Sequence, residues 1–257
     1  DDELSDTALY RIVQVINRNQ DVEMIYSDED KIDETGLRRH PYFKPDWNPD
    51  LFYSQNMFSH LGAYKLSLIK EINGFRVGFE GSQDYDLALR CIEKVDANQI
   101  HHIPHVLYHW RVHQDSTSLS NQTKPYAQIA AQHALSEHFV KNNVAAEVFV
   151  DRSGYRVRYT LPKDSPLVTV IIPVRNRCDL LERCVNSIFE KTSYKSYEIV
   201  VVDNGSDEPE LSDYLRRLVV EEKVRVIRDD SPFNFSRLVN QGIEVARGDL
   251  VLLLNND

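Results

Sequence analysis

The chain has 257 residues, 42% hydrophobic and 27% charged, which is typical of a soluble globular protein with one or two domains. Its net charge of −10 excludes general binding to nucleic acid, because no surplus of lysine and arginine is present to neutralise phosphates. No apolar run reaches the ~18 residues that span a bilayer, so we expect no transmembrane segment, and the three cysteines are too few for a disulfide framework.

Residues 1–123 mix helices, strands and a long loop, which indicates an α+β half that is rich in aromatic residues. Ser5 is placed to cap the first helix. The apolar face of that helix is predicted to hold Leu9, Ile12, Val13 and Ile16. The elements expected after it are a strand at 22–30, an ordered loop at 41–56, a strand at 58–65, a helix at 82–95 and a strand at 102–113.

The run Gly-Ser-Gln-Asp-Tyr-Asp-Leu-Ala-Leu-Arg at 81–90 is the strongest candidate for chemistry in this half. Asp86 and Arg90 are four residues apart on the predicted helix and can form an ion pair. Asp84 lies two positions earlier, so it points to a different side and is free to face a cleft. The helix N-terminus stabilises its ionised form, which is what a general base needs. The alternative is that Asp84 is an ordinary helix cap.

Residues 124–165 are predicted to connect two halves. They begin with a helix at 124–142, continue with an alternating strand at 154–161 and end in the linker Pro-Lys-Asp-Ser-Pro at 162–166.

Residues 166–257 show the regular alternation of strands and helices that parallel βαβ units produce. The runs at 167–174 and 197–206 lack polar alternation, as expected for strands that helices cover on both faces. The strands are predicted at 167–174, 197–206, 224–230 and 249–257. Two helices between them carry the apolar stripes Leu181, Cys184, Val185, Ile188 and Leu211, Tyr214, Leu215, Leu218.

Polar residues follow three of these strands, at the edge where open α/β sheets bind ligands. They are Asp203, the strand end Pro173 to Asn176, and Asn255 to Asp257. Asp203 can instead serve only to form a turn. Carboxylate and amide oxygens suit Mg²⁺ or Mn²⁺, and His109 or His113 could complete such a shell, although a lone histidine is more often structural.

Four segments together resemble family 2 glycosyltransferases of the GT-A fold, over nearly the whole chain. They are Ile-Ile-Pro-Val-Arg-Asn at 171–176, Val-Val-Asp-Asn-Gly-Ser at 201–206, the run 240–257 and the run 81–90. Segments at 26–31, 42–51 and 102–111 further resemble bacterial polysaccharide and O-antigen glycosyltransferases that carry two such domains in tandem.

The resemblance implies a nucleotide-diphospho-sugar donor, carrying UDP or dTDP, and a glycan or lipid-linked glycan acceptor. It also implies a cytoplasmic enzyme, free or peripheral at the inner face of the membrane, and a divalent cation, Mg²⁺ or Mn²⁺. Asp203 would contact the base, and Pro173, Arg175 and Asn176 would line the same pocket. The further implied residues are Asn240 for the nucleotide, Asn255 and Asp257 in the metal-binding DxD motif, and His113 as a late metal ligand.

In this family the reaction would be an inverting displacement at the anomeric carbon, with Asp84 as the base that takes the acceptor proton. Two positions depart from the family pattern. The DxD position reads Asn-Asn-Asp, and the Glu-Asp position reads Gln83-Asp84.

The order of the halves is unusual for a single domain of this family, because the acceptor half (1–123) precedes the nucleotide half (166–257). We therefore interpret the chain as the C-terminal half of one tandem domain followed by the N-terminal half of the next. Each half alone would expose apolar sheet surface, so the halves could dock as one circularly permuted domain. That arrangement predicts Asp84 and Asp257 within about 15 Å of each other.

The main rival interpretation is a non-catalytic fragment or nucleotide-binding module of a larger enzyme. A nucleotidyltransferase is disfavoured because the sequence lacks a glycine-rich phosphate loop, and a dehydrogenase because it lacks GxGxxG.

Overall fold

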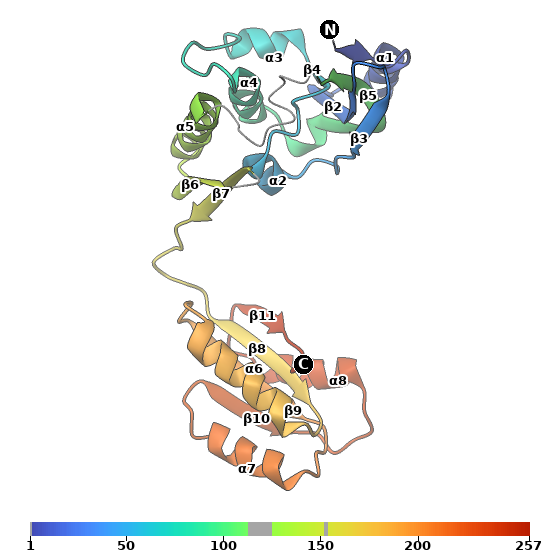
Figure 1. Ribbon diagram of the computed structural model, residues 1–257. Coiled ribbons are helices and arrows are strands. Elements are labelled where there is room, and N and C mark those ends of the chain that lie inside the picture. Colours follow the sequence, from blue (N-terminus) through green and yellow to red (C-terminus); the bar gives the residue numbers. More distant parts are fainter. Residues whose placement is uncertain (1, 113–124, 152–153) are drawn as a thin grey trace. The chain divides into compact units, whose positions relative to one another are not determined.

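The computed structural model describes residues 2–112, 125–151 and 154–257. The chain divides into two compact units, Asp1–Thr160 (unit 1) and Leu161–Asp257 (unit 2). Each unit has its own sheet, shown in Figure 1, and its own hydrophobic core. In the described part of the chain, no helix combines the length and hydrophobicity that a membrane span requires.

Unit 1 is built on a mixed sheet in which β2 and β5 run parallel and form the long central pair. The other strands pair antiparallel with one of these two. In sheet order the strands are β1 (Glu3–Leu4), β5 (Ile100–Arg111), β2 (Met24–Ile32) and β3 (Arg38–Tyr42), while β4 (Gly62–Tyr64) also pairs with β2.

Helices cover both faces of this sheet. Helix α1 (Ala8–Arg18) packs through Ala8 against Ile25, Ile103 and Leu107 on one face. The larger core on the other face is built from α2 (Pro49–Ser54), α3 (Leu66–Glu71), α4 (Gln83–Ile92), α5 (Pro125–Lys141) and the hairpin of β6 (Ala146–Asp151) and β7 (Gly154–Tyr159). A short 3₁₀ helix, Ala97–Gln99, leads into β5.

The loop predicted at 41–56 is wrong in part, because it contains helix α2. Asn48 caps this helix by accepting a hydrogen bond from the Leu51 N–H at 2.9 Å, and Pro49 occupies its first turn. Asn48 and Pro49 are a helix-start signal in the sequence. The prolines and aromatic residues around them favoured a loop prediction instead. The strand predicted at 58–65 is limited to β4.

The first helix begins at Ala8 with Thr7 as its N-cap residue, and its predicted apolar face is only partly correct. Ile12 packs against the core, but Leu9, Val13 and Ile16 are 69%, 52% and 43% exposed. The helix packs through the neighbouring stripe of Ala8, Ile12 and Val15 instead.

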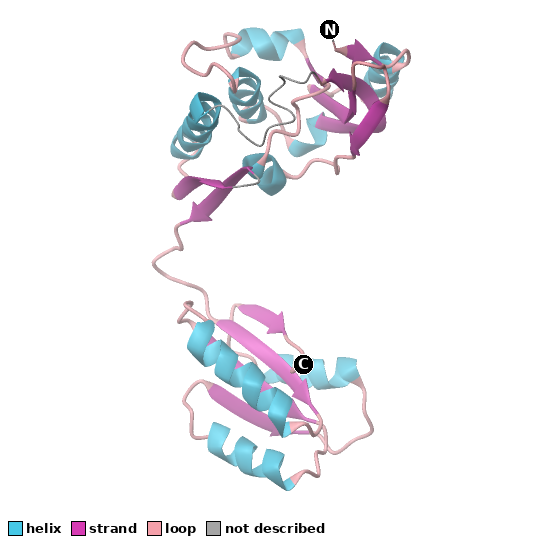
Figure 2. Ribbon diagram, in the orientation of Figure 1, coloured by secondary structure: helices cyan, strands magenta, loops and turns pink. Residues whose placement is uncertain are grey.

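Unit 2 is a four-stranded parallel sheet, which confirms the prediction of an α/β fold with a parallel sheet. Its strands stand in the order β10 (Val224–Arg228), β9 (Tyr197–Asp203), β8 (Val168–Val174) and β11 (Leu250–Leu253). Helices α6 (Cys178–Lys191) and α7 (Pro209–Leu218) cover one face, and α8 (Phe235–Val245) covers the other (Figure 2).

Strand β11 differs from the covered strands predicted at 167–174 and 197–206, because its side chains are exposed. Its four residues, Leu250–Leu253, are 43% to 54% exposed, whereas β9 is buried along its whole length. Strand β11 pairs only with β8 among the described strands.

A buried polar network fixes the entry to β11. The Glu198 carboxylate accepts hydrogen bonds from the Thr169 hydroxyl at 2.7 Å, the Arg247 N–H at 2.7 Å and the Arg225 guanidinium. The Gly248 N–H donates to the Thr169 hydroxyl at 2.9 Å. The backbone comes so close that a Cβ at Gly248 would lie 2.6 Å from the Thr169 nitrogen.

Candidate functional site

The carboxyl ends of three parallel strands meet at one edge of unit 2. Val174 at the end of β8 pairs with Asp203 at the end of β9, and Asp203 pairs with Arg228 at the end of β10. The β8 and β9 strand ends selected from the sequence therefore lie side by side, at the edge where open α/β sheets bind ligands.

Asp203 is buried and both of its carboxylate oxygens are engaged. Oδ1 accepts a hydrogen bond from the Ser206 N–H at 3.0 Å, and Oδ2 accepts one from the Arg228 Nη1 at 2.9 Å. Arg228 also donates to the Asp230 carboxylate and to the Ser206 carbonyl. Asp203 thus stabilises a turn, the alternative role considered for it in the sequence analysis. It also anchors an arginine at the strand ends.

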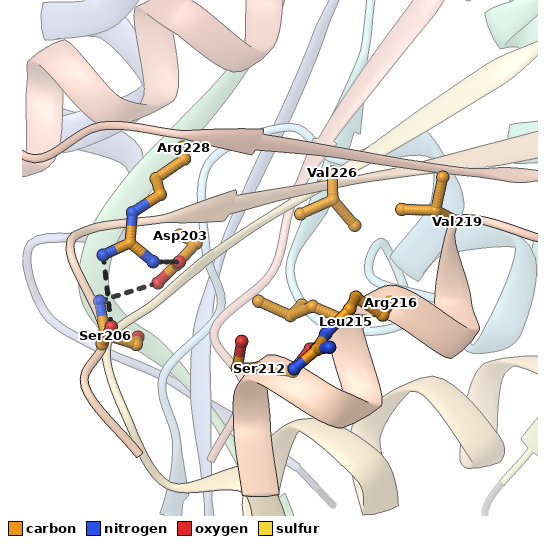
Figure 3. Close-up of a pocket in the computed structure, with 8 residues that line it drawn as sticks. All are labelled: Asp203, Ser206, Ser212, Leu215, Arg216, Val219, Val226 and Arg228. Atoms are coloured by element: carbon orange, nitrogen blue, oxygen red, sulfur yellow. Dashed lines mark hydrogen bonds and ion pairs between the residues drawn. The ribbon is translucent and has the colours of Figure 1, made fainter. Parts of the chain in front are cut away.

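A pocket of about 250 Å³ opens beside this ion pair, between α7 and β10 (Figure 3). Leu215, Val219 and Val226 give it an apolar wall. Its polar lining consists of Asp203, Ser206, Ser212, Arg216 and Arg228. An apolar wall opposite hydrogen-bonding groups suits a flat, polar ring.

Asn176 joins the loop after β8 to the loop after β9. Its N–H donates to the Ser206 hydroxyl at 2.8 Å, and its amide nitrogen donates to Asp207 Oδ1 at 2.8 Å. Its amide oxygen accepts the N–H groups of Asp207 and Glu208 at 3.0 and 3.4 Å. Asn176 and the following Arg177 both adopt left-handed backbone conformations, with φ of 57° and 58°. Asn176 therefore shapes this edge of the sheet.

The neighbouring predicted residues are less constrained. Pro173 is half-buried within β8, opposite Val202. Arg175 is exposed and has no hydrogen bond or ion pair with any described residue, so its guanidinium is available to a ligand.

Sequence reasoning missed Asn204, which follows Asp203. It is buried, and its amide nitrogen donates to the Asp229 and Ser231 carbonyls, both at 2.9 Å. Its Oδ1 is buried without a partner in the described part of the chain. Asn204 could have been found as the second polar residue after the β-branched run, but only Asp203 was predicted as a site residue.

Asp229, at the end of β10, was also missed. It is buried and accepts hydrogen bonds from the Ser231 hydroxyl and N–H and from the Arg237 Nε at 2.9 Å. These bonds, the hydroxyl of Ser231 first, hold its pKa at about 2. Asp229 is therefore a fixed anion that ties the start of α8 to the sheet.

The remaining predicted residues of this half are exposed. Asn240 lies on α8, two residues before Gly242, where a Cβ would come within 2.6 Å of Ile171. Asn255 and Asp257 follow β11, and the Asn255 carbonyl accepts a contact from the Cys184 thiol at 3.8 Å. Within the described residues no three histidine, cysteine or acidic side chains are grouped to hold a metal ion. A lone carboxylate at Asp257 fits a cation whose shell a diphosphate completes.

In unit 1 the helix geometry expected for the acidic run is confirmed. Asp86 is buried and binds Arg90 at 2.9 Å, together with Arg76. Asp84 lies on a different side of α4, where it is half-buried and its Oδ2 accepts the Asn56 amide at 2.8 Å. Its Oδ1 has no partner among the described residues.

The surroundings of Asp84 include a tyrosine from β7. Burial and then the nearby Asp84 carboxylate raise the pKa of Tyr155. The Gln83 side chain, at the position that departs from the family pattern, accepts the Gly81 N–H at 2.7 Å. Gln83 therefore closes the turn before α4.

Three imidazole–carboxylate pairs link β2 to its neighbours, and sequence reasoning did not find them. Asp28 binds His102 at 2.8 Å, and Asp30 binds the buried His109 at 2.6 Å, which gives His109 a structural partner. Glu29 binds His60 at 3.0 Å; although burial opposes it, this bond and the charge of Lys44 lower the pKa of Glu29. His113 lies outside the described residues.

Asp84 belongs to unit 1 and Asp257 to unit 2, so their separation of about 15 Å or less stays a prediction.

Comparison with known proteins gives a family match within the second unit. Residues 169–257 match the family model Glycosyl transferase family 2. The whole chain aligns with the O-antigen biosynthesis protein RfbC of Myxococcus xanthus at 35% identity and with protein y4gI of Sinorhizobium fredii at 44% identity. It covers 20% of the first and 29% of the second, so it spans less than a third of either relative.

Among solved structures, the chain is similar to the mannosyltransferase PcManGT from Pyrobaculum calidifontis, which was solved in complex with GDP-Man and Mn²⁺. The identity is 25%, the match covers 38% of this chain and 29% of that one, and the TM-score is 0.34.

Proposed function

On the premise that residues 169–257 are a Glycosyl transferase family 2 segment, we propose that the chain takes part in sugar transfer from a nucleotide-diphospho-sugar to a hydroxyl of a glycan or lipid-linked glycan. The observation that carries this proposal is the convergence of Asp203, Arg228 and the Asn176-linked loops around one pocket at the carboxyl edge of the sheet.

In this proposal the base of a UDP- or dTDP-sugar occupies that edge. The apolar wall of the pocket would take one face of the ring, and Arg228, fixed by Asp203, would present a donor beside it. Arg175 has no competing partner and could meet the phosphates. Asn240 is exposed on α8 and is proposed as a further contact to the nucleotide.

A divalent cation is part of the proposal. Asp257 would hold Mg²⁺ or Mn²⁺, Asn255 would lie beside it, and the diphosphate would fill most of the coordination shell. When bound, such a cation supplies positive charge at the leaving diphosphate. His113 is proposed as a late ligand on the basis of its sequence position alone.

Asp84 is proposed as the base that activates the acceptor hydroxyl. The Asn56 amide fixes one carboxylate oxygen and leaves Oδ1 to accept the proton. An inverting displacement needs such a base on the side of the anomeric carbon opposite the leaving group. A cytoplasmic location goes with this proposal, and the three cysteines are free thiols.

The division into an acceptor half (1–123), a connector (124–165) and a nucleotide half (166–257) also stays a proposal. In it, one complete site needs a nucleotide half and an acceptor half, as two tandem domains would provide them. The docking of the two halves of one chain as a circularly permuted domain belongs to the same proposal.

The second candidate is a nucleotide-binding module without catalysis of its own. Two observations favour it: an amide replaces a carboxylate at Asn255, and Gln83 is engaged with the backbone of its own turn. Such a module would bind nucleotide and transfer no sugar.

Calorimetric titration of the full chain with UDP and dTDP, with and without Mn²⁺, tests the proposal. We expect binding by the wild type, a loss of at least about tenfold in Asp203→Asn and Asp203→Ala, and none in Glu222→Ala, whose side chain is exposed outside the pocket. No binding of either nucleotide in any combination would refute the nucleotide site.

Donor turnover with an acceptor glycan separates the two candidates. Asp84→Asn should keep nucleotide affinity and lose transfer. A wild-type chain that binds nucleotide and never transfers would support the module instead.

A further inference from the structure

The pocket beside Asp203 has a polar end and an apolar end (Figure 3). Asp203 and Arg228 stand at the carboxyl ends of β9 and β10 and form the polar end. Val226 precedes Arg228 by two residues on β10, so its side chain lies on the same face of the sheet, about 7 Å further from that edge. The strand therefore fixes how far the apolar end lies from the ion pair.

Helix α7 supplies the facing wall of the apolar end. The Val219 N–H donates to the Leu215 carbonyl at 3.2 Å, so these two residues lie one helical turn apart on the same side. Leu215 is buried, whereas Val219 is 59% exposed although it lines the pocket. Together with the half-buried Val226, it offers aliphatic surface to a ligand.

The volume of the pocket limits what it can hold. At about 250 Å³ it is smaller than the pockets of about 300–1,000 Å³ that enclose a drug-sized molecule. A single ring with a small substituent suits this volume, and the ribose and diphosphate of a nucleotide would lie outside it. The pocket is therefore placed to discriminate between bases.

The two edges of a pyrimidine ring match the two ends of the pocket. Of the five N–H bonds of the Arg228 guanidinium, three are taken by described acceptors, which leaves two for the ring carbonyls on one edge. The opposite edge, C5 and C6, carries no hydrogen-bonding group and would face Val219 and Val226. A purine in the same pose would press its N7, a hydrogen-bond acceptor, against these side chains and leave it unpaired.

We propose that Val219 and Val226 recognise the methyl group at C5 of thymine, so that the site prefers dTDP-sugars to UDP-sugars. This inference rests on the proposed nucleotide function and narrows its donor class. Uracil has only a hydrogen at C5, whereas the methyl group of thymine extends the ring toward the two valines. One buried methyl group is worth ~0.8 kcal/mol, which corresponds to about a fourfold difference in affinity.

Calorimetric titration of the full chain with dTDP, dUDP and UDP, all with Mn²⁺, measures this preference. The nucleotides dTDP and dUDP differ only in the C5 methyl group, and dUDP and UDP differ only in the 2′-hydroxyl group. We expect dTDP to bind about fourfold more tightly than dUDP. Any difference between dUDP and UDP belongs to the sugar and not to the two valines.

Threonine substitutions test whether the valines are the source of the preference. Val219→Thr and Val226→Thr keep the shape of the side chain but place a hydroxyl group beside the methyl group, so each should reduce the dTDP:dUDP ratio to below about twofold. Val220→Thr is the matched control, because Val220 is exposed and does not line the pocket. Val226 also packs against the core, so Val219→Thr decides the test if circular dichroism shows that Val226→Thr has not folded.

The outcomes separate this inference from the function on which it rests. Equal binding of dTDP and dUDP, or tighter binding of dUDP, would overturn the methyl preference and leave the nucleotide site in place. A preference for dTDP that persists unchanged in Val219→Thr and Val226→Thr would show that other residues recognise the methyl group, which also overturns the inference. No binding of any nucleotide would overturn the nucleotide site and the inference together.

Discussion

At the scale of single residues, the acidic side chains differ in how completely their oxygens are engaged. Asp86 and Asp203 have arginine partners and are buried, whereas Asp84 keeps one oxygen without a described partner. Proton transfer requires an oxygen that is available, so Asp84 suits chemistry and Asp86 suits structure. Asp203 can act on a ligand through the arginine that it holds.

The buried Asp86 gives a stability prediction. Asp86→Asn removes the charge that compensates Arg76 and Arg90, so we expect unit 1 to lose about 3 kcal/mol of unfolding free energy. Glu71→Gln, which breaks an exposed pair with Lys94, should cost less than about 0.5 kcal/mol. Urea unfolding followed by tryptophan fluorescence reports on unit 1, which contains both tryptophans. Equal losses in the two variants would contradict the prediction.

Asp229 gives a prediction about pH. Hydrogen bonds from Ser231 and Arg237 lower its pKa from an ordinary value near 4 to about 2 in the folded protein. Because the folded-state pKa is depressed, the stability that the anion contributes is fully present above pH ~4 and is lost as the pH falls toward 2. Asp229→Asn should flatten the acid limb of the stability curve measured by circular dichroism in urea, and Glu222→Gln should leave it unchanged. An NMR titration that places the Asp229 carboxyl near pH 4 would refute this.

At the scale of elements, the entry to β11 depends on one glycine. In Gly248→Ala the new methyl group would lie 2.6 to 2.7 Å from the Thr169 nitrogen and the Leu167 carbonyl, both of which are backbone atoms. We expect a cost of about 2 kcal/mol or more in unit 2, with faster hydrogen exchange in β8 and β11. Arg247→Ala is the matched control, because Arg247 joins the network only through its backbone N–H. A Gly248→Ala protein as stable as this control would show that the backbone yields.

The same scale shows how far the sequence predicts this fold. The four strands of unit 2 are legible because buried parallel strands leave long β-branched runs, as in β8 and β9. The sequence does not predict the exposure of β11, because exposure depends on which elements lie beside a strand rather than on its own residues. Helix α2 was not predicted, because proline and aromatic residues obscured the cap at Asn48. Strand β6, the hairpin partner of β7, was not predicted either.

The candidate site was predictable to a similar extent. Helical spacing correctly predicts the Asp86–Arg90 pair, because partners four residues apart are set by local geometry. The Asp203–Arg228 pair and the bonds of Asn204 to the β10 end join residues more than 20 positions apart, so only the sheet register brings them together.

At the scale of the whole molecule, two independently packed units are joined by the exposed segment 161–164 and the residues up to β8. We expect limited trypsin digestion to cut first after Lys163, because the segment lies outside helices and strands and is exposed. Mass spectrometry should show fragments 1–163 and 164–257, and Lys163→Gln should remove this pair. Earlier cleavage inside either unit would contradict the division.

The Asn176 junction has a consequence for the rate at which a ligand can bind. The hydrogen bonds around this residue already join the loops after β8 and β9, so these loops need not be ordered when a molecule arrives. An association step that requires no loop closure is governed by diffusion and electrostatic attraction, and affinity is then set mainly by the time that the bound molecule stays. Discrimination between ligands at this edge of the sheet would then depend on the dissociation rate rather than on the association rate.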